Sequence, residues 1–364
     1  MKANPVKIEI MDTTLRDGEQ TSGVSFVPHE KLMIARALLQ DLNVDRIEVA
    51  SARVSEGEVD AVRSICQWAR QTGRLHRVEV LGFVDGHASL DWIHACGCKN
   101  INLLCKGSEN HCTNQLKKTL EQHVADIRRS LDYAEELGIA VNVYLEDWSN
   151  GMKHSPDYVF ALMDALKDTK IRRFMLPDTL GILNPLDLLG YIRKMVKRYP
   201  GVHFDFHAHN DYDLAISNVL AAVLGGCRGI HTSVNGLGER AGNAPLASVQ
   251  AILKDQFNAQ TDIDESRLNE VSRMVERLKD FRGKVIIQTM FMKGMSEGAD
   301  VDNTSDRFVE PWLRAVKEIS PSQVMIYTID RETPDHELKK ATREELDRIA
   351  GRIRQEGLEV SVSY

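Results

Sequence analysis

The stretch VHFDFHAHND, residues 202–211, combines a predicted buried strand with two histidines at its carboxyl end. Apolar and polar residues alternate over residues 202–206, which is the pattern of a strand. Side chains two residues apart on a strand point the same way, so His207 and His209 project together from one face. Two imidazoles with carboxylates beside them suit a metal ion, although histidines in this spacing are more often ordinary surface or core residues. The arrangement of the other predicted strands, and the residues that follow them, distinguish between these two interpretations.

Predicted strands and amphipathic helices alternate through the first two thirds of the chain. The strand candidates are residues 6–11, 46–49, 78–83, 101–104, 140–145, 173–176, 203–207 and 229–234. The helix candidates include residues 30–42, 56–72, 116–137, 156–166, 185–198 and 212–224. Eight strands alternating with helices over about 250 residues predict an α/β fold of the (β/α)8 TIM barrel type. The alternative, a doubly wound open sheet, usually has a glycine-rich turn after its first strand, where this chain has MDTT at residues 11–14.

The character of the sequence changes after the last barrel helix. We predict a catalytic barrel over residues 1–262, a helical linker over residues 263–282, and a small α/β segment of unknown role over residues 283–364. Within that last segment, strands are predicted at 284–292, 323–329 and 358–362, and helices at 309–317 and 343–355.

Length and composition exclude several classes of protein. The 364 residues, 43% of them hydrophobic, suffice for one large domain and an appendage. No apolar run is long enough for a membrane span and the polar N-terminus does not resemble a signal peptide, so we expect no membrane contact and a cytoplasmic location. The net charge of -7 argues against a nucleic-acid partner and leaves small-molecule substrates. The six cysteines show no zinc-ribbon spacing, which predicts free thiols.

Polar residues collect where the predicted strands end. Such residues follow the first, fifth, sixth, seventh and eighth strands: Asp12, Arg16 and Asp17; Glu146 and Asp147; Asp178 and Thr179; His207 and His209; and residues 235–243. In a TIM barrel the carboxyl ends of all strands meet at one rim, and that rim carries the active site. The sequence therefore predicts one polar site built from five loops.

The residue types at this rim suit a metal and a carboxylate ligand. Asp17 is a hard oxygen ligand able to share a divalent ion with two imidazoles, and the planar fork of Arg16 suits a carboxylate or an enolate oxygen. The glycine-rich residues 236–242 allow close backbone approach to a ligand, and Asn243 could add an amide oxygen. Taken alone, each feature is better explained as a helix cap, a surface ion pair or an ordinary turn.

Three motifs together resemble the DRE-TIM metallolyase family. They are DTTLRDGEQ at residues 12–20, HAHND at residues 207–211 and NGLGERAGN at residues 235–243. Their order and spacing over roughly residues 6–275 are similar to the branch that condenses acyl-CoA with 2-oxo acids, the 2-isopropylmalate, homocitrate and citramalate synthases. The lyase branch, typified by hydroxymethylglutaryl-CoA lyase, carries a cysteine in the last of these loops, where this chain has none.

The resemblance implies a role for each of the matching residues. Asp17, His207 and His209, with Asn243 close by or bound, would hold a divalent cation such as Mn²⁺, Zn²⁺ or Mg²⁺. Acetyl-CoA would be the co-substrate and a homodimer the expected assembly. The implied catalytic residues are Arg16 and Glu146, and the implied substrate-binding residues are Arg16, Gln20, Asn102, Tyr144 and Thr179.

Two of these positions depart from the family pattern. Tyr144 stands where the family often has serine, and Asn102 stands where isopropylmalate synthases tend to have histidine. Both positions shape the pocket for the side chain of the 2-oxo acid. Overall similarity ranks 2-oxoisovalerate first, and pyruvate, 2-oxoglutarate and oxaloacetate remain open.

The C-terminal part departs further from the family. The helical linker that supplies a histidine to the partner subunit, and the leucine-sensing domain, are not recognisable after about residue 279, so we expect no feedback inhibition by leucine. Residues 283–364 resemble the later half of a radical-SAM barrel but lack its three-cysteine motif, which favours a structural appendage without an iron–sulfur cluster. Three hypotheses follow: a 2-isopropylmalate synthase-like condensing enzyme, a carbon–carbon lyase or aldolase on the same metal site, and a non-catalytic metal- or oxo-acid-binding protein.

Overall fold

Eight parallel strands close into a barrel in which neighbours along the chain pair and β8 pairs with β1. The structure, a computed structural model, describes residues 6–53, 56–257, 259–279, 286–296, 298–319, 321, 323–329 and 337–364. The barrel strands are β1 (Glu9–Asp12), β2 (Arg46–Ser51), β3 (Val78–Phe83), β4 (Asn100–Lys106), β5 (Ala140–Glu146), β6 (Phe174–Asp178), β7 (Phe204–Ala208) and β8 (Gly229–Thr232). The predicted (β/α)8 fold is confirmed, and every predicted strand of residues 6–234 overlaps an observed one.

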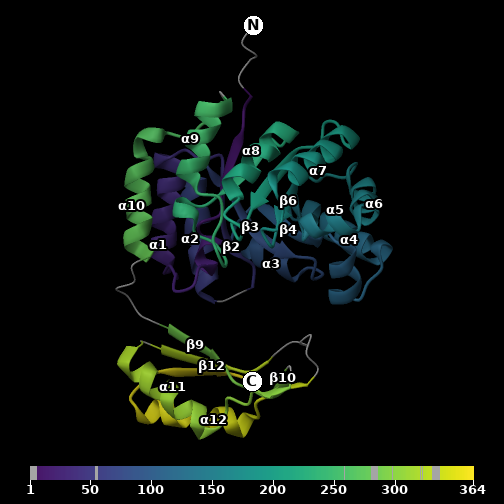
Figure 1. The fold of residues 1–364 in the computed structure, drawn as a ribbon. Helices are drawn as coiled ribbons and strands as arrows, with labels where there is room; N and C mark the ends of the chain where they lie inside the picture. The colour runs from purple at the N-terminus through teal and green to yellow at the C-terminus, as the bar shows by residue number, and fades with distance from the viewer. Residues whose placement is uncertain are drawn as a thin grey trace. The chain divides into compact units, whose positions relative to one another are not determined.

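Helices surround these strands on the outside, as Figure 1 shows. They are α1 (Pro28–Arg36), α2 (Glu56–Gln71), α3 (Ala88–Ala95), α4 (Leu120–Glu136), α5 (Trp148–His154), α6 (Pro156–Leu166), α7 (Pro185–Arg198), α8 (Ala215–Gly225), α9 (Leu246–Phe257) and α10 (Leu268–Lys279). Short helical turns lie at η1 (Gly18–Gln20), η2 (Ala37–Asp41), η3 (Leu75–Arg77), η4 (His111–Gln115), η5 (Val234–Gly236) and η6 (Glu265–Arg267). The apolar faces of the helices and the outward side chains of the strands form one continuous core.

Capping residues explain where two of the helices begin. The predicted helix 116–137 starts only at Leu120, because the Thr119 side chain accepts a hydrogen bond from the Gln122 N–H and completes a capping box. The Asn184 side chain accepts hydrogen bonds from the backbone N–H groups of Leu186 and Asp187 and caps α7 in the same way. Local side chain–backbone bonds thus set helix boundaries that hydrophobic periodicity alone leaves uncertain.

The inward-facing positions of the barrel are rich in charged residues. On β7, Phe204 and Phe206 join the outer core, whereas Asp205 faces the interior and accepts a hydrogen bond from Nη2 of Arg46 at 2.5 Å. Arg46 also donates to Oε2 of Glu79 at 3.1 Å, so its guanidinium joins strands β2, β3 and β7. A buried charge is tolerated only when it is paired, which makes these contacts a condition for closing the barrel.

Residues 286–364 contribute a second compact unit with its own core. Its elements are β9 (Ile286–Met290), β10 (Met292–Ser296), β11 (Ala299–Asp300), α11 (Asp306–Ile319), β12 (Gln323–Tyr327), β13 (Leu338–Lys340), α12 (Arg343–Gln355) and β14 (Val360–Ser363). The parallel sheet β14-β12-β9 carries both helices on one side (Figure 1), and β11-β10-β13 forms a small antiparallel sheet. Val309 and Leu313 of α11 and Leu346 and Ile349 of α12 pack with Val324 of β12. The predicted α/β character of this segment is confirmed.

The boundary between the two units lies at residue 280. Within the predicted linker, residues 265–279 form η6 and α10, and Val271 and Val275 of α10 are buried in the barrel core. Residues 280–282 of that linker, and the first two residues of the predicted strand 284–292, lie outside the described residues. The helix that we predicted as a linker therefore packs on the barrel.

Two expectations from composition can be compared with the described residues. None of their helices is both long and apolar enough to cross a membrane. All six cysteines are free, as their spacing predicted, and the structure shows that all six are buried.

The buried charges of the barrel interior allow a test of the fold. We expect Arg46→Ala to lower the free energy of unfolding by about 3–5 kcal/mol, because the carboxylates of Asp205 and Glu79 stay buried without their partner. Urea unfolding followed by circular dichroism measures this change. Arg193→Ala, which alters an exposed residue of α7, is the control and should change stability by less than about 0.5 kcal/mol. An Arg46→Ala midpoint equal to that of the control would contradict the prediction.

Candidate active site

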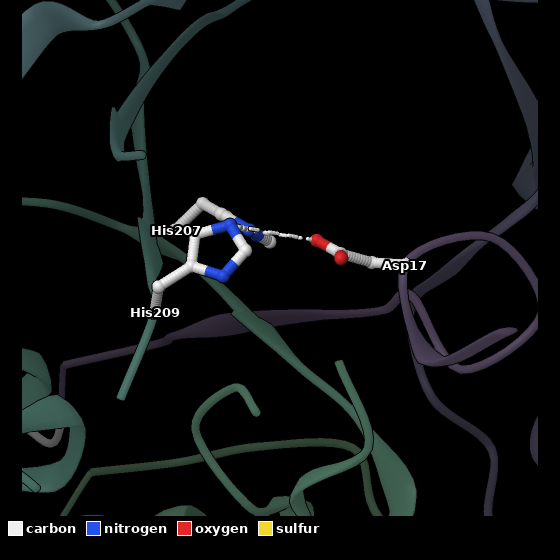
Figure 2. Close-up of side chains that lie close together, drawn as sticks. All are labelled: Asp17, His207 and His209. Carbon is white, nitrogen blue, oxygen red and sulfur yellow. Dashed lines mark hydrogen bonds and ion pairs between the residues drawn. The ribbon is translucent and has the colours of Figure 1, made fainter. Parts of the chain in front are cut away.

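Asp17, His207 and His209 converge at the carboxyl end of the barrel (Figure 2). Oδ2 of Asp17 lies 3.0 Å from Nε2 of His207 and 3.8 Å from Nε2 of His209. The two Nε2 atoms are 3.3 Å apart, and all three ligand atoms lie within 4.8 Å of one another. In Figure 2 both imidazoles project from one strand towards the carboxylate on the opposite side. Two nitrogen ligands and one oxygen ligand at such separations can share a single divalent ion.

The fold brings these residues together although they are far apart in sequence. His207 belongs to β7 and His209 follows it, and both face the interior because side chains alternate along a strand. Asp17 lies in a tight turn after β1, in which its N–H donates to the carbonyl oxygen of Thr13 at 2.9 Å. The same turn is held to the end of β8, where Thr13 N–H donates to the Thr232 carbonyl oxygen at 2.8 Å. Only β8 separates β1 from β7, so barrel closure joins the two segments.

The protonation states of the three residues suit metal binding. Burial lowers the pKa of His209 to about 4 and also lowers the pKa of His207, although the hydrogen bond with Asp17 opposes this second shift. Burial disfavours ionisation of Asp17, but Arg16 and the two imidazoles outweigh it and hold the pKa of the carboxyl well below its ordinary value. Near neutral pH the site therefore presents two neutral imidazoles and one carboxylate, which are the forms that bind metals.

Asn243 is the candidate for a fourth ligand. Its backbone forms an isolated β-bridge with His209, which fixes it beside the histidines, and its side chain is buried. Among the described residues, neither Oδ1 nor Nδ2 of Asn243 has a hydrogen-bond partner, and neither carboxylate oxygen of Asp17 accepts a hydrogen bond of good geometry. Buried polar atoms rarely stay without partners, so the carboxylate of Asp17 and the amide oxygen of Asn243 fit a bound cation, while the NH2 group of Asn243 is left as a donor for another ligand of that ion.

Arg16 connects this triad to a second buried cluster. Its Nη1 lies 3.2 Å from Oδ2 of Asp17, and its Nε donates to Oε2 of Glu48 at 2.5 Å. The two carboxylates outweigh burial and raise the pKa of the guanidinium further, so it stays charged. A fixed cation beside the proposed metal site can stabilise negative charge that develops on a substrate oxygen.

Glu48 and His231 are site residues that the sequence analysis missed. Glu48 is fully buried on β2, and its Oε1 accepts from Nδ2 of Asn102 at 2.7 Å. His231 on β8 lies with Nδ1 at 3.1 Å from the Tyr144 hydroxyl and Nε2 at 3.1 Å from Oδ2 of Asp205. A signal was present in the sequence, since both are polar residues within predicted buried strands. They were missed because they lie in the middle of their strands, whereas the sequence analysis considered the residues at the carboxyl ends.

Asn102 has both ends of its amide engaged inside the barrel. Its Nδ2 bonds to Glu48, and its Oδ1 accepts from Nδ2 of Asn142 at 2.8 Å. Burial raises the pKa of Glu48, with Arg16 and Asn102 opposing that shift. Asn102 and Arg16 thus donate to the two oxygens of the same carboxylate, that of Glu48.

Glu146, Thr179 and Gln20 lie on the same rim but have other contacts. Glu146 ends β5 and forms an ion pair with Lys106, the last residue of β4. The Thr179 hydroxyl accepts from the backbone N–H of Asp147 at 3.0 Å. Gln20 is exposed at the end of η1. Among the residues that the structure describes, the metal-ligand cluster consists of Asp17, His207 and His209 and includes none of these three.

Arg240 holds three of the rim loops together. It donates to both carboxylate oxygens of Asp211, at 2.7 and 2.9 Å, and to the carbonyl oxygen of Thr179 at 2.8 Å. This planar, bidentate contact links the loops after β6, β7 and β8. The loops that carry Thr179, His209 and Asn243 are thereby fixed relative to one another.

Comparison with known proteins identifies the family. Residues 7–275 match the HMGL-like family. The chain belongs to this family. The match covers the whole barrel and confirms the resemblance that the three motifs indicated.

The HMGL-like chain is similar to several citramalate and 2-isopropylmalate synthases. It is 36% identical to a putative (R)-citramalate synthase CimA of Methanopyrus kandleri over 76% of this chain and 53% of that protein. It is 37% identical to a 2-isopropylmalate synthase of Saccharolobus solfataricus over 75% of this chain and 69% of that protein. A probable 2-isopropylmalate synthase of M. kandleri is 31% identical over 97% of this chain and 70% of that protein, so this similarity extends into the second unit.

This HMGL-like chain spans about half to 70% of the length of these relatives. Among solved structures, hydroxymethylglutaryl-CoA lyase of Pseudomonas aeruginosa has a TM-score of 0.64 at 18% identity, over 85% of this chain and 99% of that chain. At this level of identity the likeness concerns the fold alone.

Removal of a proposed ligand should weaken metal binding. We expect Asp17→Asn and His209→Ala each to reduce the affinity for Mn²⁺ or Zn²⁺ at least ~100-fold. Substitution of residues that only hydrogen-bond to a metal ligand already lowers metal affinity ~10–100-fold. Isothermal titration calorimetry on the metal-free protein measures this affinity. His29→Ala, at an exposed position of α1, is the control. Wild-type affinity in both ligand variants would place the metal elsewhere.

Metal affinity should be lost at a lower pH than at a site with ordinary imidazoles. Protons compete with the metal for Nε2, so affinity falls as pH falls. Because burial lowers the pKa of His209 to about 4, we expect little change between pH 8 and 6 and a steep loss only below about pH 5. Calorimetric titrations in buffers across this range test it. A loss centred near 6.5, the ordinary imidazole value, would contradict the lowered pKa.

Proposed function

We propose that this chain condenses acetyl-CoA with a 2-oxo acid and releases CoA, as a synthase of the 2-isopropylmalate or citramalate type. The observation that carries the proposal is the convergence of Asp17, His207 and His209 next to the fixed cation of Arg16. The named relatives, which match 74–97% of this chain, support the same reaction class. Overall similarity placed 2-oxoisovalerate first among the substrates, and the citramalate synthase relatives support pyruvate equally.

The reaction needs one carbon–carbon bond and one hydrolysis. The methyl group of acetyl-CoA loses a proton, its carbon attacks the ketone carbon of the 2-oxo acid, and the ketone oxygen gains a proton to become a hydroxyl. Water then cleaves the thioester, which releases CoA and leaves a carboxylate. A divalent cation held by Asp17, His207, His209 and Asn243 would act as a Lewis acid on the ketone.

The protein residues of the rim would divide the remaining tasks. Arg16 is a permanent cation whose direction is fixed by Glu48 and Asp17, so it can stabilise the enolate or alkoxide oxygen without moving. Glu146 is our candidate for proton transfer at the acetyl methyl group, with Lys106 keeping it in place. Thr179 and Gln20 are candidates for contacts with the substrate carboxylate.

The family resemblance also predicts that the protein is a homodimer.

A carbon–carbon lyase is the second candidate function, since the fold is shared with hydroxymethylglutaryl-CoA lyase. The two classes differ in the loop after β8. Here residues 235–243 contain no cysteine, and Cys227, the nearest in sequence, is buried before β8. The composition of this loop therefore favours condensation.

A thiol-release assay tests the proposed reaction directly. We expect CoA release that requires acetyl-CoA, a 2-oxo acid and a divalent cation together, and that is lost in His207→Ala. Arg16→Lys keeps the charge but loses the planar fork, and we expect it to lower kcat about 10²–10³-fold. Arg193→Lys, on the exposed face of α7, is the matched control.

The same assay separates the alternatives. Cleavage of the hydroxy acid or its CoA ester, without the forward reaction, would favour a lyase. Calorimetric binding of metal and 2-oxo acid without turnover would favour a binding protein. Full activity in His207→Ala would exclude the proposed metal site from the reaction.

A further inference from the structure

Lys106 and Glu146 face each other at the mouth of the barrel. They are the last residues of β4 and β5, and they occupy paired positions in the register of these two strands. The ammonium group of Lys106 forms an ion pair with Oε2 of Glu146. The two side chains are 16% and 24% exposed, so a ligand can reach both from solvent. A carboxylate and a cation are thus available side by side.

Strand alternation directs both side chains of this ion pair into the barrel. Cys105 and Leu145, which precede them on the two strands, pack in the outer core. Because successive side chains on a strand point to opposite faces, Lys106 and Glu146 point inwards. They stand at the carboxyl ends of their strands, where a TIM barrel carries its active site. The ion pair therefore belongs to the same rim as the proposed metal site.

The layer of side chains beneath the ion pair connects it to the proposed metal site. Tyr144 stands two residues before Glu146 and shares its face of β5. The Tyr144 hydroxyl lies 3.5 Å from Nη2 of Arg16, and its ring meets the His207 ring edge-on with centroids 6.2 Å apart. One layer of side chains thus separates the ion pair from Arg16 and His207.

The backbone of Lys106 is held by two buried side chains. Its N–H donates to Nε2 of His123 at 3.0 Å, and its carbonyl oxygen accepts from the Tyr158 hydroxyl at 3.0 Å. Burial lowers the pKa of His123 to about 4, so this ring stays neutral and can accept. The next N–H, that of Gly107, donates to the Glu146 carbonyl oxygen at 2.6 Å, and a Cβ on Gly107 would lie only 2.9 Å from that oxygen. These contacts fix Lys106 beside Glu146.

The first step of the proposed reaction needs a cation close to its base. The inference rests on the proposed function, in which Glu146 removes a proton from the methyl group of acetyl-CoA. The electron pair of the broken C–H bond moves towards the thioester carbonyl group, so negative charge develops on its oxygen. Bond lengths of about 1.5 and 1.2 Å put this oxygen about 2.4 Å from the methyl carbon. A methyl group in contact with the carboxylate therefore brings the thioester oxygen within reach of the Lys106 ammonium group.

We propose that Lys106 is a catalytic residue whose ammonium group donates a hydrogen bond to the thioester oxygen of acetyl-CoA as the enolate forms. In this step the C–H bond breaks, Glu146 gains the proton, a double bond forms between the two acetyl carbons, and the oxygen becomes an anion beside Lys106. When the enolate carbon attacks the ketone, the electron pair returns and the thioester carbonyl group forms again. Arg16, held between Asp17 and Glu48, is then left for the oxygen of the ketone.

Substitution of Lys106 tests its part in proton removal. Lys106→Met should lower kcat for CoA release about 10²–10³-fold, which is the usual loss for a removed oxyanion donor. The KM of the 2-oxo acid should change less than about threefold, because the ketone is bound elsewhere. Methyl-deuterated acetyl-CoA should slow this variant further, because proton removal then limits its rate. Lys106→Arg keeps a cation and should recover part of the activity.

A binding measurement tests the contact with the oxygen without turnover. S-carboxymethyl-CoA is a thioether whose carboxylate presents an anionic oxygen near the position of the enolate oxygen. By calorimetry, Lys106→Met should weaken its binding at least ~10-fold more than that of acetyl-CoA, because a charge-assisted hydrogen bond is lost. A lysine that only positions Glu146 would leave the ratio of the two affinities unchanged. Lys106→Gln provides the same comparison where the methionine variant does not fold.

Lys254→Met is the matched control for both measurements. Lys254 is an exposed lysine of α9 that also forms an ion pair with a glutamate, Glu265. Its loss should change neither kcat nor the ratio of the two affinities.

The outcomes distinguish this inference from the proposed function. Wild-type CoA release by Lys106→Met, a rate of this variant that is insensitive to deuteration, or an unchanged affinity ratio overturns the role of Lys106 and leaves the condensation intact. Absence of CoA release by the wild-type protein with every 2-oxo acid, together with a preference for S-carboxymethyl-CoA that requires Lys106, overturns the condensation and leaves the contact with the oxygen. If neither CoA compound binds, both proposals fail.

Discussion

Charged groups inside the barrel have to be paired, and this constraint links the fold to the site. Arg46 joins Asp205 near the amino ends of the strands, and Asp205 in turn contacts His231. The contacts continue through Tyr144 to Arg16, whose guanidinium lies beside Asp17. Because each member loses its water shell on folding, removal of one partner leaves another buried without compensation. The interior that closes the barrel thus also orients the cation at its mouth.

The same burial prepares the proposed metal site for its ligand. Removal from water keeps His207 and His209 neutral, while Arg16 keeps Asp17 ionised. A cation would add a further partner for the carboxylate of Asp17 and a first one for Oδ1 of Asn243, which has no hydrogen-bond partner among the described residues. Such a preorganised arrangement needs no rearrangement when charge develops on a substrate, which is the main physical advantage of an enclosed active site.

Sequence reasoning located the rim residues better than the interior ones. His207 and His209 could be paired because strand alternation is local, and Asp17 could be added because barrel strands end at one rim. Glu48 and His231 were missed, since a polar residue in the middle of a predicted strand gives no indication of its partner across the barrel. The role of Asn102 in substrate binding stays a prediction, and the structure adds that its amide bonds to Glu48 and Asn142, which the sequence did not indicate. The second unit was predicted as α/β, but its two separate sheets depend on long-range pairing.

The sequence alone determined the eight strands, the order of their loops and the three motifs, because periodicity, capping residues and turn residues act within a few positions of the chain. The tertiary structure decided which of these residues meet. Asp17 and His207 are distant in sequence, and they come within 3.0 Å only because β8 closes the sheet between β1 and β7. It also decided that Tyr144 stands beside Arg16 and His207. Such contacts arise from packing across the barrel, which no local pattern encodes.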